Sequence, residues 1–165
     1  MLTKNALKEI CPEFDVEKAV DAALVLAHTD EFSGAGSIYM SKAEKAVLVA
    51  GRFSSLDNIL AALLWEAPYA LIVGAGFPAD GIPDDAVALL RQRIFADLCI
   101  LPDTAIVEME HLKTSAALLH MYVERKRPLE RDLLTSIPPE KALVGYTERV
   151  YFLWAELTVS QNNPL

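Results

Sequence analysis

Residues 45–52 are KAVLVAGR and residues 69–76 are YALIVGAG, two short apolar runs that both contain glycine at their end. Continuous runs of aliphatic and β-branched residues are typical of strands that are buried on both faces of a parallel sheet. Between them, residues 56–66 carry leucines at helical spacing, and Ser54 or Ser55 can cap that helix. A strand, a helix and a second strand form a βαβ unit, which predicts an α/β fold.

A third apolar run, DLCIL at residues 97–101, adds a third strand to this prediction, and residues 38–40 are a short fourth candidate. Right-handed crossovers place the strands 45–51, 69–73 and 98–101 in one small, mostly parallel sheet of three to four strands flanked by helices. The predicted core of this sheet contains eight aliphatic residues: Leu48, Val49, Leu63, Leu71, Ile72, Leu89, Leu98 and Ile100.

The length of 165 residues indicates a single α/β domain over residues 1–165. We expect a helical lead-in over residues 1–40, a βαβαβα core over 45–126 and a carboxyl-terminal extension over 129–165. Asp15 can cap a helix over 16–28, and Asp103 or Thr104 can cap a long helix over 105–125. A short helical segment is predicted over 129–136. The aromatic run at 151–154 fits either a helix, which we favour, or an edge strand.

Composition narrows the possible partners and the cellular location. The net charge of −8 argues against nucleic-acid binding, which depends on clustered basic side chains that neutralise phosphates. The apolar fraction of 53% and the mean hydropathy of +0.26 are high for a soluble domain, and an apolar subunit interface is one explanation. No uninterrupted apolar stretch approaches the roughly 20 residues of a membrane span, and the first residues lack the pattern of a signal peptide. We therefore expect an acidic, cytoplasmic protein that forms homo-oligomers and contacts neither membrane nor nucleic acid.

Several short motifs occur in a fixed order between residues 46 and 112. They are VAGR at 49–52, ILAAL at 59–63, LIVGAG at 71–76, Pro78 and LPDTA at 101–105. In this order and spacing the segment resembles a DRTGG-type domain, a module of HPr kinase/phosphorylase and of long phosphotransacetylases. Ala50 stands where the family has an acid, and Gly74-Ala75-Gly76 stands for its Thr-Gly-Gly. The resemblance implies an α/β module that senses ligands or regulates, without catalysis of its own.

The predicted ligand-binding residues lie at the ends of the predicted strands. Gly74 and Gly76 let a ligand approach the backbone closely, and Arg52 follows the first strand, where it can meet an anion. Asp103 and Thr104 hold the equivalent position after the third strand, where both also suit a helix cap. If these residues converge, they form the rim of one pocket for a small anionic ligand.

Catalytic and metal-binding signatures are absent from the sequence. No Gly-x-Ser-x-Gly motif is present, and neither Cys11 nor Cys99 has a recognisable base, so no nucleophile is predicted. Glu108 and His111 have the Glu-x-x-His spacing of carboxylate-bridged metal sites, but a second such pair is missing. We assign no catalytic residue and no metal ligand, and the sequence indicates no particular cofactor.

The sequence thus favours a non-catalytic regulatory or ligand-sensing module that binds a small anionic ligand or a partner protein and oligomerises. The aromatic segment 151–157 is the candidate subunit contact, because tyrosine and tryptophan are enriched at interfaces. Two alternatives remain open at this point. One is a small enzyme acting at the carboxyl edge of the sheet, and the other is a purely structural protein–protein interaction subunit.

Overall fold

The chain folds as a bundle of helices. The computed structural model describes residues 2–32, 39–121 and 137–162. Within these ranges there are eight helices and no strand, and an isolated antiparallel bridge joins Asp30 to Ser41. The helices are α1 (Lys4–Ile10), α2 (Val16–Ala27), α3 (Lys42–Ala50), α4 (Leu56–Leu63), α5 (Ala67–Gly74), α6 (Asp84–Asp97), α7 (Thr104–Leu119) and α8 (Pro139–Asn162).

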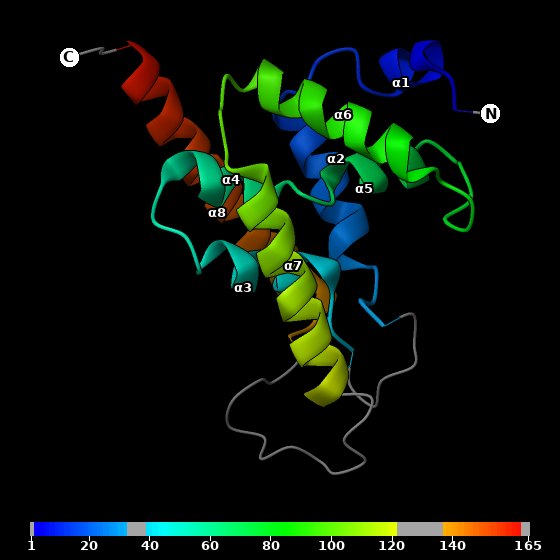
Figure 1. Cartoon of the computed structure of the whole chain (residues 1–165), viewed down its shortest axis with the longest axis vertical. Helices are drawn as coiled ribbons and strands as arrows, with labels where there is room; N and C mark the ends of the chain where they lie inside the picture. Colours follow the sequence, from blue (N-terminus) through cyan, green and yellow to red (C-terminus); the bar gives the residue numbers. More distant parts are fainter. Residues whose placement is uncertain (1, 33–38, 122–136, 163–165) are drawn as a thin grey trace.

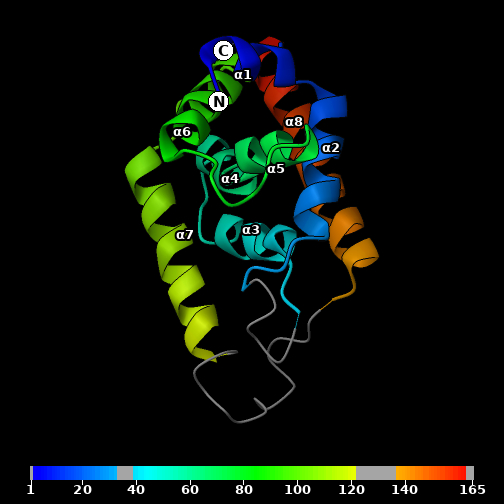
Figure 2. The same cartoon turned by 90° about the vertical axis from the view of Figure 1, so that its right-hand side faces the viewer.

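Three short helices occupy the middle of the bundle, and longer helices surround them. Figure 2 shows α3, α4 and α5 between α7 on one side and α2 with α8 on the other, while α1 and α6 cover one end (Figures 1 and 2). In agreement with this view, α2 packs on α5 and α8, and α3 packs on α4, α7 and α8. Small side chains allow these helices to approach closely. The fully buried alanines include Ala22, Ala23, Ala61, Ala62 and Ala70.

The predicted parallel sheet, and with it the α/β class, is wrong. Residues 45–50 belong to α3 and residues 69–73 to α5. Residues 98–101 form the turn that follows α6, where Cys99 adopts a positive φ of 54°. A helix that is enclosed on several sides is apolar all round, and periodicity over a short run does not distinguish it from a buried strand. The expected βαβαβα core over 45–126 is a set of helices, α3 to α7, in the described residues.

Local signals at the helix ends explain why these segments are helical. The Ser41 hydroxyl caps α3 by accepting a hydrogen bond from the backbone N–H of Glu44 at 3.1 Å. Pro68 lies in the first turn of α5, where its missing N–H leaves no hydrogen bond unmade. Gly76 has a φ of +97° and donates its N–H to the carbonyl of Val73 at 2.9 Å, a helix-terminating turn that favours glycine. The glycine that was expected to end a strand therefore ends a helix.

Other helix predictions are confirmed. The predicted lead-in over 1–40 contains α1 and α2, and α2 begins directly after its predicted cap, Asp15. Ser55 caps α4 and Asp103 caps α7, also as predicted. The aromatic run 151–154 lies inside α8, so the favoured helix is correct there. The short helix expected over 129–136 falls outside the described residues.

Most of the predicted core residues are buried, but they are buried between packed helices and not in a sheet. Six of the eight predicted core residues are buried, whereas Leu89 is half-buried and Leu48 is exposed. Leu48 lies on the face of α3 that neither α4 nor α7 covers fully, and it lines two surface pockets. The sheet prediction placed it in the interior because every residue of a two-sided strand is enclosed.

One stretch, Leu56–Gly74, is long and apolar enough to cross a membrane by length and composition alone. It comprises α4, α5 and the turn between them, and 61% of its most apolar window is buried inside the protein. Core helices of soluble proteins have the same composition. The stretch is therefore weak evidence for a membrane span, and the fold is consistent with a soluble protein.

Candidate functional site

The turn between α4 and α5 is held by side chains from three other helices. Because α4 ends at Leu63, the last carbonyl groups of this helix have no partner within it. The buried Tyr146 hydroxyl of α8 donates to the carbonyl of Leu63 at 2.6 Å. The Arg91 Nε of α6 donates to the carbonyl of Trp65 at 2.9 Å, and its guanidinium lies 3.8 Å from the centre of the Trp65 ring. These contacts satisfy buried polar groups and fix the break in the central helices.

His111 of α7 supplies a third contact to the same turn. Its Nε2 lies 2.9 Å from the carbonyl oxygen of Ala62, so Nε2 carries the proton that is donated. The ring also stacks on Trp65, with centroids 5.8 Å apart and planes tilted by 22°. Burial, together with the charge of Lys45, lowers the pKa of His111 to about 4. The imidazole is therefore neutral at pH 7 and serves as a hydrogen-bond donor within the core.

A cluster of charged side chains lies beside this turn and joins α3, α5 and α7 to the segment after α2. Lys45 Nζ lies 3.1 Å from Glu31 Oε1 and 3.0 Å from Glu66 Oε2. Lys42 Nζ lies 3.2 Å from Glu31 Oε2 and 3.0 Å from Glu66 Oε1. The Ser115 hydroxyl donates to Glu31 Oε1 at 2.9 Å. Each lysine thus bridges the same two carboxylates.

The charges in this cluster balance, and none of its four charged side chains is more than 18% exposed. The side chains of Lys45 and Glu31 are 5% and 8% exposed. Burial opposes the charge on Glu66, but Lys45 and Lys42 outweigh it and hold the pKa of Glu66 below its usual value. Burial likewise opposes the charge on Lys42, and Glu66 and Glu31 reverse that effect and raise its pKa. The two lysines and the two carboxylates neutralise one another, and the cluster fixes the packing of the segments that carry them.

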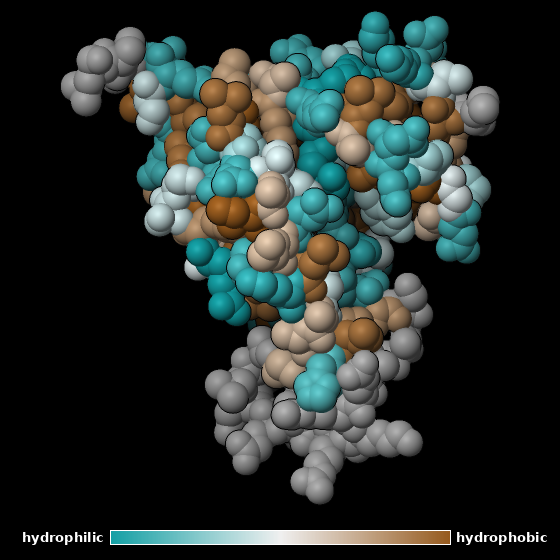
Figure 3. Space-filling model, viewed as in Figure 1, coloured by the Kyte–Doolittle hydropathy of each residue, from teal (hydrophilic) through white to brown (hydrophobic). Residues whose placement is uncertain are grey.

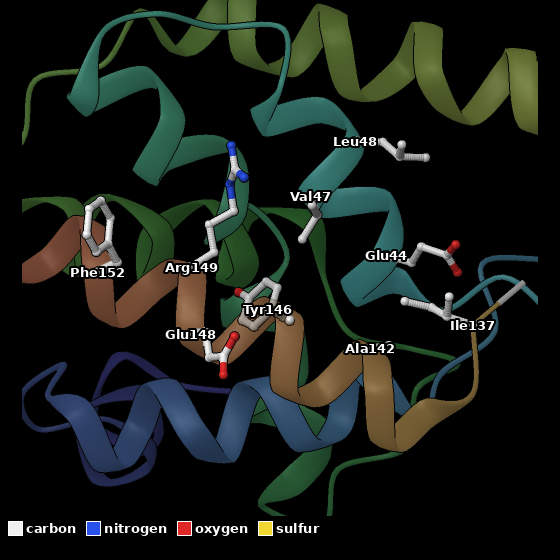
Figure 4. A pocket seen from close by; sticks show the side chains of 10 residues that line it. Glu44, Val47, Leu48, Ile137, Ala142, Tyr146, Glu148, Arg149 and Phe152 are labelled. Carbon is white, nitrogen blue, oxygen red and sulfur yellow. The ribbon is translucent and has the colours of Figure 1, made fainter. Parts of the chain in front are cut away.

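A groove between α3 and α8 is the candidate binding site. It has a volume of about 540 Å³, within the usual range for small-molecule sites. Its walls are mainly apolar, with Glu44, Glu148 and Arg149 as the charged groups. In Figure 4, Glu44 and Ile137 lie at one end, Phe152 lies at the other, and Arg149 extends from α8 toward α3 between them. The remaining lining residues are Val47, Leu48, Ala142, Gly145 and Tyr146.

Glu44 is the unusual polar group of this groove. Its Oε2 is buried and has no hydrogen-bond partner among the described residues. Burial raises the pKa of Glu44, and a hydrogen bond from the backbone N–H of Ile137 offsets this in part. A buried carboxyl oxygen without a partner is rare in folded proteins, because the desolvation cost is not repaid. A ligand that carries a donor would supply the missing partner.

The pocket that Arg52 lines does not include the other predicted ligand-binding residues. Arg52 lines a second pocket of about 460 Å³ between α3 and α7, with Glu110, Lys113 and Met121 among its neighbours. Gly74, in contrast, is the last residue of α5, and a Cβ added there would lie 3.5 Å from the Val25 side chain of α2. Neither Gly74 nor Gly76 lines the pocket of Arg52.

Asp103 has the capping role that its position allowed, and Thr104 follows it inside the helix. The Asp103 carboxylate accepts a hydrogen bond from the backbone N–H of Ile106 at 3.2 Å, and Thr104 is the first residue of α7. The backbone N–H of Asp103 also donates to Asn58 Oδ1 at 2.8 Å, which ties the start of α7 to α4. Neither residue lines the Arg52 pocket.

The cysteines and the candidate metal pair have structural surroundings. Cys11 is buried, and burial raises the pKa of its thiol, whereas Cys99, which lies in the predicted strand 98–101, is exposed. His111 points to the carbonyl of Ala62, and Glu108 is exposed, so the two do not form a metal pair. Among the described residues, no group of three or more histidine, cysteine or acidic side chains is placed to hold a metal ion.

The predicted subunit contact, residues 151–157, packs within the chain on one side and is exposed on the other. Trp154 stacks on Phe14, with ring centroids 5.7 Å apart and planes 5° from parallel. Leu153 and Leu157 are buried, whereas Tyr151 and Phe152 are 43% and 65% exposed. The aromatic run therefore anchors α8 to the segment between α1 and α2.

Comparisons with known proteins find little similarity. No family model matches the chain, and no solved structure matches it. A threonine–tRNA ligase from Oleidesulfovibrio alaskensis is 34% identical over 74 residues, which cover 43% of this chain and 12% of that enzyme. The chain thus spans a small part of the length of this relative. The resemblance to a DRTGG-type domain stays a prediction, although the α/β fold that it implies is not present in the described residues.

Proposed function

We propose that this protein is a non-catalytic, cytoplasmic ligand-binding module whose site is the groove between α3 and α8. The observation that carries the proposal is the half-buried Glu44 side chain, whose buried Oε2 has no partner among the described residues, in a mainly apolar groove of about 540 Å³. A ligand that donates a hydrogen bond to this oxygen would supply the partner that it lacks. The charged cluster around Lys45 and the turn held by His111 form the rigid frame beside this groove.

The groove indicates the chemistry of the ligand. Its apolar walls, which include Val47, Ile137 and Phe152, suit an aliphatic or aromatic body. Glu44 suits an amine or hydroxyl donor, and the exposed Arg149 suits an anionic group. A small molecule with an apolar body, an amine and a carboxylate meets all three conditions. The anion predicted from the sequence is thus one part of the proposed ligand, and Arg149 rather than Arg52 is its proposed partner.

The partial match to a threonine–tRNA ligase does not extend the proposal to aminoacylation. The match covers 12% of that enzyme and 43% of this chain. The enzyme alternative considered from the sequence required the edge of a sheet, which the described residues do not contain. A binding role requires only the groove and its three charged groups.

Thermal unfolding of the full chain with matched probes tests the proposal. The probes are phenylalanine, phenethylamine and 3-phenylpropionate, which share one apolar body and carry both charged groups, the amine alone or the carboxylate alone. A ligand at ~100 times its dissociation constant adds about 2.7 kcal/mol to stability. We expect the zwitterion to stabilise most. We also expect Glu44→Gln to reduce the gain from the amine, and Arg149→Ala to reduce the gain from the carboxylate.

A blocking variant and a control variant test whether the probes bind in the groove between α3 and α8. A Cβ added at Gly145 meets nothing within 4 Å, so Gly145→Leu extends a side chain into the groove and is expected to abolish stabilisation by every probe. Arg52→Ala alters the other pocket and is expected to leave the response unchanged. Stabilisation that persists in Gly145→Leu, or no response to any of the three probes, would contradict the proposed site.

A further inference from the structure

The outer face of α7 carries a second apolar stripe that none of the other described helices covers. The inner face of α7 supplies the buried residues Val107, His111 and Leu118. On the opposite side, the exposed large hydrophobic residues include Met109, Leu112 and Leu119, which are 52%, 66% and 40% exposed. A soluble helix normally has one apolar face and one polar face. Two apolar faces indicate that α7 has a partner on each side.

The outer stripe has the spacing of a coiled-coil seam. Ala105, Met109, Leu112, Ala116 and Leu119 are all exposed, and they follow one another at intervals of four, three, four and three residues. This is the d-a-d-a-d pattern of a heptad repeat, the seam along which two helices pack side chains into one another. A seam of this kind recognises a second helix better than it does a small molecule or a flat surface.

The position of α7 leaves the seam open to a partner. In Figure 2, α7 is the outermost helix on the left side of the bundle, and α3 and α4 lie beside its inner face. In the space-filling view, apolar residues gather along the front of α7 (Figure 3). A second helix can therefore lie along this face without meeting another described helix of the same chain.

The charges beside the seam identify the partner. Position 108 corresponds to g and position 113 to e of the repeat, and they carry the exposed residues Glu108 and Lys113. In a parallel pair, a g residue faces the e residue that lies five positions later on the other chain, and Glu108 and Lys113 have this separation. In an antiparallel pair, g faces g and e faces e, and α7 has no opposite charges of that kind. The seam is therefore complementary to itself in the parallel orientation.

We propose that the protein forms a parallel two-fold dimer in which α7 pairs with α7 of a second copy. The helix α7 has 16 residues and is about 24 Å long, which is short for a coiled coil. We therefore expect a reversible dimer with a dissociation constant in the micromolar range, as for small interfaces. This inference is independent of the α3–α8 groove, and it uses a different surface from the segment 151–157.

Sedimentation equilibrium of the full chain tests the association. The wild-type mass is expected to rise with concentration from 18.1 kDa toward twice that value. Leu112→Glu introduces a charge into the seam and is expected to weaken association at least tenfold. Leu24→Glu is the matched control, because Leu24 is 50% exposed on α2 and lies outside the seam. A wild-type chain that stays monomeric up to millimolar concentration overturns the proposal, and so does a dimer that Leu112→Glu leaves intact.

Charge reversal and cross-linking test the orientation. Lys113→Glu sets two carboxylates against each other in the parallel pair and is expected to weaken the dimer, whereas adding Glu108→Lys to the same chain restores it. Ala116→Cys in a Cys99→Ser background is expected to form an intermolecular disulfide, because equivalent a positions face each other only in a parallel pair. Ala88→Cys on the exposed face of α6 is the control. A persistent dimer without the cross-link at position 116, or without rescue by the second charge, overturns the parallel α7 pair.

Discussion

His111 Nε2 donates a hydrogen bond to the carbonyl oxygen of Ala62 at 2.9 Å, which links α7 to the end of α4. The other ring nitrogen, Nδ1, is buried and has no hydrogen-bond partner among the described residues. Protonation would place a charge in the core beside Lys45, and the pKa of His111 is accordingly lowered to about 4. The stability of the folded protein therefore depends on pH through His111.

The stability of the protein is expected to fall as the pH decreases from about 6.5 to about 4. In this range the unfolded chain binds a proton at His111 and the folded chain does not, so the proton favours unfolding. The shift corresponds to a loss of about 3 kcal/mol across the window. Urea unfolding of the wild type and of His111→Phe at a series of pH values measures the effect. The variant, which keeps an aromatic ring beside Trp65, is expected to show a flatter profile, and identical slopes would contradict the assignment.

Tyr146→Phe is expected to lower the free energy of unfolding by about 1–3 kcal/mol, because it leaves the buried carbonyl of Leu63 without its 2.6 Å donor. Burial raises the pKa of Tyr146, so the hydroxyl remains protonated and able to donate. Tyr151→Phe removes the same atom from an exposed site on the same helix and should change stability by less than about 0.5 kcal/mol. Equal effects of the two variants in urea unfolding would show that the buried hydrogen bond contributes nothing.

Lys45→Met is expected to destabilise the protein by about 3–5 kcal/mol, because it leaves Glu31 and Glu66 buried with a single lysine between them. Lys18→Met is the matched control. Lys18 forms an exposed pair with Asp21 at 3.8 Å, and such pairs contribute about 0–1 kcal/mol. Chemical denaturation of both variants separates the two cases. A loss below 1 kcal/mol for Lys45→Met would mean that the cluster has little effect on stability.

The helix caps were predictable from the sequence, but the identity of the central elements was not. Asp15, Ser55 and Asp103 cap the helices that they were expected to cap. For α3, the pattern Ser41-x-x-Glu44 was available as a signature of a helix start, yet the apolar run after it favoured a strand. Short enclosed helices lose the alternation of polar and apolar residues on which such predictions depend.

The candidate site could not be predicted, because its parts are distant in sequence. Glu44 on α3 and Arg149 on α8 are separated by more than a hundred residues, and only the packing of the two helices brings them to one groove. The resemblance to an α/β family pointed instead to the glycines at 74 and 76, which end α5. The burial of a carboxyl side chain depends on packing, and no local motif marks it.

Glu44→Gln is expected to stabilise the protein at neutral pH relative to the wild type. The pKa of Glu44 is raised by burial, so the folded chain holds this proton more tightly than the unfolded chain does. The resulting stability is fully present below the pKa of the unfolded chain, near 4.5, and is lost as the pH rises through the higher pKa of the folded chain. The glutamine variant does not titrate and avoids this loss. Its advantage in urea unfolding should therefore grow from pH 4 to pH 7, whereas Glu148→Gln on the exposed rim should show no such trend. An advantage that stays constant with pH would mean that the Glu44 carboxylate is not held in an unfavourable environment, and the groove would lose the feature that marks it as a binding site.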